Sequence, residues 1–269
     1  MIEKKLNNSP IVYYINKNID GDRKWLMFMH AAFVTHEMFN KQIEYFKNSY
    51  NIIAVDIIGH GKSLAIMKGD SIDKMSGWMK ELLDKQQIDK INLLGISLGT
   101  VISQDFANKY PDKIESLACF GGYDINNFDK NIQKSNRSVQ VFMMIKALFS
   151  IKWFAKANKK ISAYTEKAQN ECYRMNLQFP KKSFMNLASL NGMVNKQQTK
   201  IRHYRLLIGC GEYDDPMAFQ AAKMWHDTEP NSQMIVFENA GHCVNMDVPD
   251  VFNMVMESFW NGKLVLPDF

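Results

Sequence analysis

The stretch INLLGISLGT, residues 91–100, holds a serine between two glycines directly after an apolar run. Residues 91–94 are typical of a buried β-strand, and residues 98–110 follow a helical pattern. Ser97 is therefore predicted to lie in a turn between a strand and a helix. Two interpretations of the turn are open: an ordinary loop serine, or a nucleophile presented at a sharp bend. The motif G-x-S-x-G alone does not decide between them.

Strand-like and helix-like stretches alternate along most of the chain. The strand-like runs are apolar throughout and lie at residues 11–14, 25–29, 52–55, 91–94, 114–120, 204–208 and 234–237. Helical patterns lie between them, at about residues 37–47, 70–86, 98–110, 216–228 and 249–260. Strands that are buried on both faces lack polar alternation. The pattern therefore predicts an α/β fold with a mostly parallel sheet covered by helices on both sides.

The alternation stops between residues 125 and 200, where only helical patterns are found. We interpret this segment as a helical cap (lid) inserted over the carboxyl ends of the strands. The core is then formed by residues 1–124 and 201–269. The stretch VFMMIKALFSIKWF, residues 141–154, could present methionine and phenylalanine side chains to a pocket below it. Such a roof suits a small-molecule substrate with an apolar acyl group.

The charge is distributed unevenly along the chain. The whole chain has a net charge of +5, but residues 125–200 hold 14 Lys or Arg and 3 Asp or Glu, a net of +11, which leaves −6 for the remainder. Three interpretations stay open: a solvated face, attraction of an anionic substrate, or contact with an anionic membrane surface. Salt-sensitive binding to liposomes would support the interpretation as membrane contact. Nucleic acid is not expected as a partner, because no recognition motif accompanies the charge.

Other features limit the classes of protein. No run of about 18 apolar residues is found, so no membrane span is predicted. The first residues, MIEKKLNNSP, lack the apolar core of a signal peptide. The widely spaced cysteines, Cys119, Cys172, Cys210 and Cys243, form no C-x-x-C pair, which favours reduced thiols in a cytoplasmic protein. Neither a metal-binding cluster nor a phosphate-binding loop is found, so no cofactor is expected. Both a monomer and a homodimer remain open.

Partners for Ser97 are found after two later strands. Asp214 follows the run that ends at residue 211, and His242 follows the run at residues 234–237. Because ligands bind at the carboxyl edge of a parallel sheet, both side chains are predicted to reach the edge that carries Ser97. Asp215 competes with Asp214, but it directly precedes Pro216 and is the natural N-cap of the next helix.

Four further residues are candidates for other roles at the site. Asp124 also ends a strand and is an alternative acid. Cys243 lies beside His242 but has no sharp turn to present it, so a packed thiol is the favoured interpretation. His30 and His60 lie in predicted turns, and we expect both to shape these turns.

Several motifs together resemble the α/β-hydrolase family. They are GISLG at residues 95–99, DIIGHGKS at 56–63 and GHCVNMDVPDVF at 241–252, with Ser, Asp and His in the family's chain order. The resemblance covers essentially the whole chain. It implies an α/β fold with a mostly parallel, doubly wound sheet of about eight strands and a helical cap insertion.

The family's catalytic triad is carried over residue by residue. Ser97 would be the nucleophile, His242 the general base, and Asp214 the acid that orients the imidazole. The oxyanion hole would use the backbone N–H groups of Leu98 and Ala32. In the loop that carries Ala32, the sequence HAAF at residues 30–33 departs from the family's His-Gly, because Ala31 replaces the glycine.

The expected function is hydrolysis of a carboxylic ester, thioester or lactone through an acyl-enzyme. One alternative is a C–C bond hydrolase or lyase with the same triad, in which Arg137 or Arg174 holds an acidic group of the substrate. Another is a ligand-binding signalling protein with slow turnover. Haloalkane and epoxide chemistry is disfavoured, because those relatives carry Asp at the position of Ser97.

Overall fold

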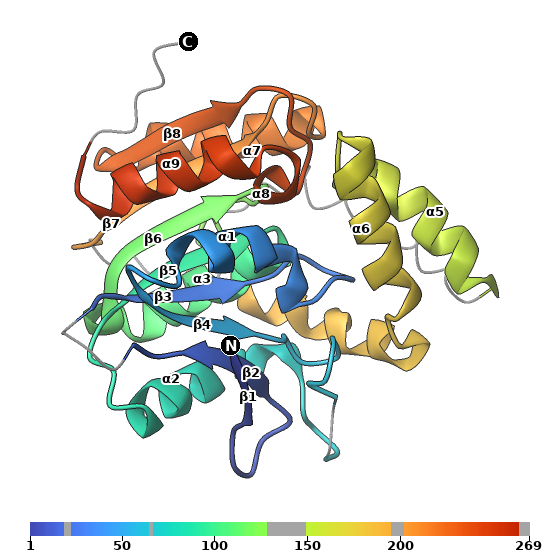
Figure 1. The fold of residues 1–269 in the computed structure, drawn as a ribbon, viewed down its shortest axis with the longest axis horizontal. Helices are drawn as coiled ribbons and strands as arrows, with labels where there is room; N and C mark the ends of the chain where they lie inside the picture. Colours follow the sequence, from blue (N-terminus) through green and yellow to red (C-terminus); the bar gives the residue numbers. More distant parts are fainter. Residues whose placement is uncertain (19–22, 65–66, 128–148, 195–201, 264–269) are drawn as a thin grey trace.

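The computed structural model describes residues 1–18, 23–64, 67–127, 149–194 and 202–263, and its centre is one eight-stranded sheet (Figure 1). Across the sheet the strands follow the order β1-β2-β4-β3-β5-β6-β7-β8. Their bounds are β1 Ile2–Lys5, β2 Val12–Asn16, β3 Trp25–Met29, β4 Asn51–Val55, β5 Ile91–Ile96, β6 Ile114–Phe120, β7 Arg205–Gly211 and β8 Ser232–Phe237.

Six of the strands form the parallel part of the sheet. β1 pairs antiparallel with β2, and β2 pairs antiparallel with β4. From β4 to β8 every pairing is parallel. β4 and β5 are buried at every position, as the solid apolar runs predicted. The parallel strands therefore bring their carboxyl ends to one edge of the sheet.

Helices cover both faces of the sheet. On one face α2 (Met75–Lys85), α3 (Leu98–Lys109) and α7 (Pro216–Thr228) contribute to one buried apolar cluster. On the other, α1 (Asn40–Phe46), the short α8 (Val244–Asp247) and α9 (Pro249–Trp260) contribute to a second. Two apolar clusters on opposite faces of one sheet are typical of a doubly wound α/β fold. The predicted fold class is therefore confirmed.

β1 is a strand that the sequence pattern did not predict. Its four residues, IEKK, are all exposed. An edge strand of this kind has no buried face and so no apolar pattern, and only its pairing with β2 defines it.

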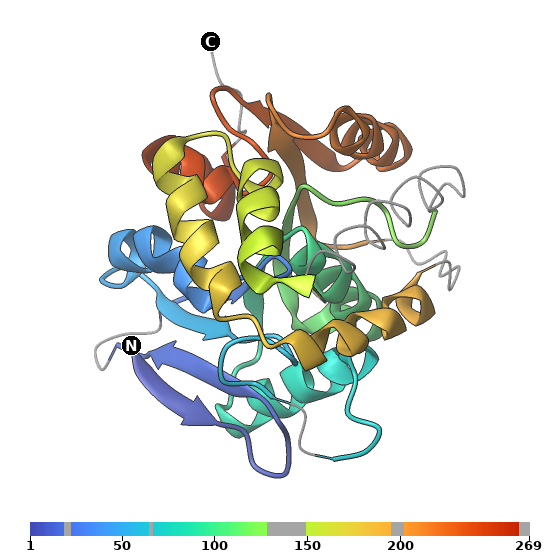
Figure 2. The same ribbon diagram turned by 90° about the vertical axis from the view of Figure 1, so that its right-hand side faces the viewer.

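Most of the described residues of the predicted cap are helical. It consists of α5 (Ile151–Ser162), α6 (Glu166–Leu177) and a 3₁₀ segment (Lys181–Met193). α5 and α6 run side by side beyond one side of the sheet, as two views show (Figures 1 and 2). Arg137 and residues 141–148 of the apolar stretch lie outside the described residues, and the boundaries of the cap stay a prediction.

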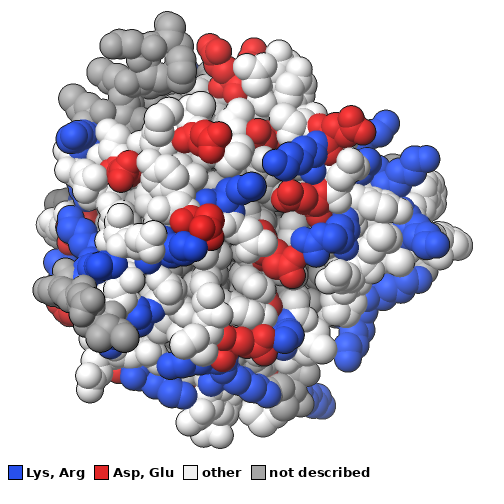
Figure 3. Space-filling view, viewed as in Figure 1, with Lys and Arg blue, Asp and Glu red and all other residues white. Residues whose placement is uncertain are grey.

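Lysine side chains project from the outer surface of these helices. Figure 3 shows Lys and Arg side chains along the side of the molecule where α5 and α6 lie. The exposed ones include Lys152, Lys156 and Lys160 of α5 and Lys167 of α6. None of the helices in the described ranges has the length and apolar character needed to cross a membrane.

Candidate active site

Ser97 lies at a sharp turn between β5 and α3. Its backbone has φ 52° and ψ −112°, a conformation that non-glycine residues rarely adopt. The two flanking glycines permit the turn. A Cβ added to Gly95 would come within 2.6 Å of the Gly99 backbone, and one added to Gly99 would overlap the carbonyl oxygen of Met29. Strand and helix therefore converge at Ser97 as the motif predicted.

The turn is joined to the neighbouring strand β6 and, through it, to His242. The N–H of Ser97 donates a hydrogen bond of 2.8 Å to the carbonyl of Phe120, the last residue of β6. Gly121 follows at φ 62°, and a Cβ there would stand 2.9 Å from Cε1 and Nδ1 of His242. The imidazole of His242 thus lies against Gly121, the residue after the Phe120 carbonyl that Ser97 bonds. Between Ser97 and His242, which are both described, no hydrogen bond is formed.

His242 and Asp214 form a closely bonded pair. Nδ1 of the imidazole lies 2.9 Å from Oδ1 and 3.0 Å from Oδ2 of the carboxylate. The Asp214 side chain is 3% exposed and that of His242 is 25% exposed. Burial alone lowers the pKa of His242, but the charge of Asp214 and the hydrogen bond to it raise that pKa above its ordinary value.

The neighbouring carboxylate of Asp215 has a separate task. It accepts a hydrogen bond of 2.9 Å from the N–H of Met217 and caps the start of α7, with Pro216 at the first position of the helix. The N-cap role that the proline predicted for Asp215 is present in the structure.

Asp124, the alternative acid, is engaged elsewhere. Its carboxylate lies 3.6 Å from the guanidinium of Arg202 and accepts a hydrogen bond of 2.9 Å from the N–H of Asn126. Arg202 also pairs with Glu229. The carboxylate of Asp124 is thus engaged in an ion pair with Arg202. The imidazole of His242 bonds Asp214 and not Asp124.

The loop after β3 is held by the buried imidazole of His30. Nε2 of His30 accepts a hydrogen bond of 2.9 Å from the N–H of Ile57, so Nδ1 carries the proton and donates to the carbonyl of Ala31 at 2.7 Å. Burial lowers the pKa of His30 to about 4, which keeps the ring neutral. Because C=O and N–H point in opposite directions across a trans peptide, this bond also orients the N–H of Ala32.

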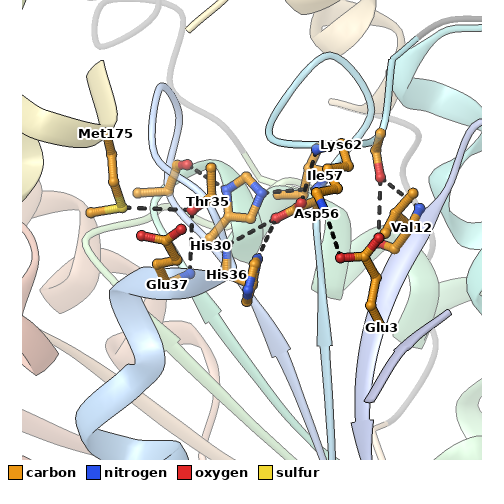
Figure 4. A network of polar contacts seen from close by, with 12 residues as sticks. Glu3, Val12, His30, Thr35, His36, Glu37, Asp56, Ile57, Lys62 and Met175 are labelled. Atoms are coloured by element: carbon orange, nitrogen blue, oxygen red, sulfur yellow. Dashed lines mark hydrogen bonds and ion pairs between the residues drawn. The ribbon is translucent and has the colours of Figure 1, made fainter. Parts of the chain in front are cut away.

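The buried carboxylate of Asp56 bonds the residues that follow it to His36, and sequence reasoning assigned Asp56 no role. Asp56 accepts hydrogen bonds from the N–H of His36 at 3.0 Å, from Nδ1 of the same residue at 2.9 Å, and from the N–H of Lys62 at 3.0 Å (Figure 4). A Cβ at Gly61 would overlap this carboxylate. The motif at residues 56–63 was the available signal, because it contains both Asp56 and Gly61.

Asp247 and Asn176 are two further residues that sequence reasoning missed. Asp247 accepts a hydrogen bond of 2.9 Å from the N–H of Gly241, the residue before His242. Asn176 of α6 donates a hydrogen bond of 3.2 Å to the carbonyl of Phe33 in the loop after β3. Asp247 lies inside the quoted motif at residues 241–252, which was a signal for it. No sequence signal marked Asn176.

Cys243 is buried beside His242. Contact with the thiol of Cys172 and burial raise the pKa of Cys243 well above its ordinary value, so the side chain remains a thiol. Within the described part of the chain, no group of three or more His, Cys, Asp or Glu side chains is arranged to hold a metal ion.

Comparison with known proteins gives relatives along the whole chain. A hydrolase of Acinetobacter baylyi, named for (E)-2-((N-methylformamido)methylene)succinate, is 24% identical over 265 residues, covering 96% of this chain and 98% of the relative. The enol-lactonase structure from Burkholderia xenovorans matches with a TM-score of 0.79 at 16% identity, covering 97% of this chain and 100% of that one. A thermophilic esterase from Thermogutta terrifontis matches with a TM-score of 0.76 at 18% identity, covering 97% and 98%.

These matches agree with the topology. The structural likenesses are below 25% identity and concern the fold alone. The model of the family described as alpha/beta hydrolase fold matches residues 24–249, which is most of the chain. The chain therefore belongs to the alpha/beta hydrolase fold family.

Proposed function

We propose that this protein is a serine hydrolase that cleaves a carboxylic ester, thioester or lactone with Ser97, His242 and Asp214. The observation that carries the proposal is the placement of Ser97. It lies on a turn with positive φ at the start of α3. Its N–H bonds the carbonyl of Phe120, and the next residue, Gly121, lies against the imidazole that is paired with Asp214. A strained serine beside a His–Asp pair is the arrangement that nucleophilic catalysis requires.

The hydrogen bond to Asp214 determines how the imidazole would act. Nδ1 donates to the carboxylate, so Nε2 carries the lone pair that would accept the Ser97 proton. The serine oxygen attacks the carbonyl carbon, and the carbonyl π electrons move to its oxygen. When the tetrahedral intermediate collapses, the leaving alcohol or thiol takes the proton from His242 and an acyl-enzyme remains. Water, deprotonated by His242, then releases the acid and restores Ser97.

Two backbone donors are proposed for the oxyanion. Leu98 is the first residue of α3, where N–H groups have no partner inside the helix. Ala32 is the second, and its peptide is oriented by the bond from His30 to Ala31. This bond supports the assignment despite the missing glycine, because a backbone donor requires an orientation and not a particular side chain.

The substrate is proposed to be a small molecule with an apolar acyl group. An apolar cluster at the loop after β3 supports this, because Phe33 packs against Phe154, Phe179 and Phe184. The Burkholderia and Thermogutta proteins are an enol-lactonase and an esterase by name, which agrees with an ester or lactone.

An anionic substrate, cleaved at a C–C bond by the same triad, is the second candidate. The lysines on α5 and α6 favour it, and the Acinetobacter relative is named for a succinate derivative. Arg174 does not support this candidate, because its guanidinium is half exposed and pairs with Glu37 at 2.6 Å. A matched pair of neutral and acidic esters, assayed at low and high salt, separates the two. A rate advantage for the acidic ester that salt abolishes would favour the second.

Labelling with a fluorophosphonate, followed by mass spectrometry, tests the proposal without knowledge of the natural substrate. We expect one adduct on Ser97 that is lost in Ser97→Ala and His242→Ala. Ser49→Ala is the matched control, since Ser49 is an exposed serine on a helix-to-strand loop. Folded protein that takes no label would refute the hydrolase and favour the ligand-binding alternative, in which a captured ligand is retained without turnover.

A further inference from the structure

Helix α6 contacts two loops that the proposed reaction uses. Its N-cap, Thr165, lies beside the loop that carries His242, and Asn176 in its last turn lies beside the loop after β3. The first loop would supply the base and the second an oxyanion donor. Twelve residues of regular helix therefore join two parts of the site that are far apart in the sequence.

Asp247 anchors the first end of α6. Its carboxylate, 9% exposed, accepts hydrogen bonds from the N–H of Tyr164 at 3.0 Å, the N–H of Thr165 at 2.7 Å and the hydroxyl of Thr165 at 2.7 Å. The same carboxylate accepts the N–H of Gly241 at 2.9 Å, directly before His242. One buried charge thus bonds both the start of the helix and the histidine loop.

A backbone contact reinforces this anchor. The N–H of Cys243, directly after His242, donates a hydrogen bond of 2.8 Å to the carbonyl of Ser162 at the end of α5. A Cβ on Gly241 would stand 2.9 Å from the N atom of Tyr164, so the two chain segments are in contact. The histidine loop is therefore bonded to the α5–α6 junction on both sides of His242.

Asn176 anchors the second end of α6. It is fully buried, and its Oδ1 accepts a hydrogen bond of 2.7 Å from Nδ2 of Asn158 on α5. This bond leaves its own Nδ2 to donate to the carbonyl of Phe33 at 3.2 Å. Phe33 has φ 68°, which is strained for an aromatic residue, and its ring packs against Phe154 at a centroid distance of 4.9 Å. Contacts with the cap thus hold Phe33, the residue after Ala32, in its strained conformation.

We propose that α6 is a brace that sets the position of the histidine loop relative to the oxyanion loop, with Asp247 and Asn176 as its positioning residues. The inference rests on the proposed hydrolase function. Reacting groups must be held within about 0.5 Å of their productive positions, and a shift of about 1 Å can reduce the rate on the order of a hundredfold. A second link runs through α8, where Asn245 donates a hydrogen bond of 2.9 Å to the carbonyl of Met38, just after the oxyanion loop.

The anchor at Asp247 is tested with Asp247→Asn, which retains the size of the side chain and removes its charge. The fluorophosphonate labelling rate of Ser97 is measured against pH at a temperature where the variant is folded by circular dichroism. We expect the rate plateau to fall by about tenfold or more. We also expect the midpoint to move to lower pH, because a displaced His242 loses part of its contact with Asp214. Asp250→Asn, an exposed carboxylate three residues along, should change neither quantity.

The anchor at Asn176 predicts a different signature. Asn176→Ala removes the bond to Phe33 but leaves the histidine loop in place. The plateau should fall by about tenfold, with the midpoint unchanged. Asn170→Ala is the matched control, because Asn170 is exposed on the same helix and the same substitution there raises the helix propensity equally. A residue with only a structural role would lower the melting temperature and leave the labelling rate of the folded protein unchanged.

Thr165 provides a second route if Asp247→Asn fails to fold. Thr165→Ser retains the hydroxyl that bonds Asp247 and should label normally, whereas Thr165→Val should repeat the Asp247→Asn profile in weaker form. Wild-type rates and midpoints in folded Asp247→Asn, Asn176→Ala and Thr165→Val would overturn the brace and leave the hydrolase intact. Failure of the wild-type protein itself to label would instead refute the proposed hydrolase.

Discussion

β5 in the sheet and α6 in the cap are attached to the rest of the molecule in different ways. β5 is paired with a parallel strand on each side, and all six of its residues are buried. α6 buries four of its twelve residues, and two polar side chains, Asp247 and Asn176, bond its ends to the loops that carry His242 and Ala32. Apolar burial depends on area and tolerates small displacements, whereas a hydrogen bond depends on distance and angle.

This difference separates stability from activity. Substitutions in the sheet should lower the free energy of unfolding and leave the chemistry of any remaining folded protein unchanged. Substitutions of the buried cap side chains that contact the two loops should lower activity by more than their effect on stability implies. Variants of both regions test this separation, from the largest expected effect to the smallest.

The largest effect is expected from a pair of fully buried phenylalanines. Phe28 lies in β3 and Phe154 in α5, and both are inaccessible to solvent. Phe28→Ala should cost about 4 kcal/mol in the free energy of unfolding, measured with urea, and leave labelling of the folded fraction at the wild-type rate. Phe154→Ala removes a neighbour of Phe33 and should lower the labelling rate as well. Equal labelling rates in both variants would contradict the separation.

Gly99→Ala tests the sheet side of the turn at Ser97. The added Cβ would overlap the carbonyl oxygen of Met29, and neither backbone can move without displacing β3 or α3. We expect a loss of about 3 kcal/mol in stability. The displaced turn should also slow labelling, so this variant is the expected exception to the separation. Ala107, a small buried residue of α3, provides the control as Ala107→Gly, which weakens the helix without any overlap.

How far the sequence predicts these features depends on how local their causes are. The turn at Ser97 needs two glycines within two residues, and Asp215 needs a proline beside it, so a short window of sequence indicates both. The bonds of Asp247 and Asn176 join residues that are 82 and 143 positions apart. The motif at residues 241–252 includes Asp247 but does not indicate its partners, and no pattern marks Asn176, so these contacts emerge only from the fold.

The pH dependence of labelling tests the His242–Asp214 pair. Because Asp214 raises the pKa of His242 above its ordinary value of 6.5, and only the neutral imidazole accepts a proton, the rate should rise with pH to a midpoint above 6.5. The stabilisation from this pair is fully present below pH 6.5 and is lost as pH rises through the folded pKa. Asp214→Asn leaves burial as the main influence, so its midpoint should fall below 6.5. An unchanged midpoint would remove Asp214 from the triad.

The smallest effect is expected at the surface pair between Arg174 and Glu37. Arg174 lies on α6 and Glu37 lies in the 3₁₀ turn His36–Phe39 that follows the loop after β3, so the pair also joins α6 to this region of the chain. The arginine side chain is 51% exposed, and water screens the attraction. Arg174→Gln should therefore change the free energy of unfolding by about 0.5 kcal/mol or less. Its labelling rate should remain close to that of the wild type, because the buried bond from Asn176 still holds the loop. A loss as large as that of Asn176→Ala would show that charge at the surface, and not the buried amide, connects α6 to the loop after β3.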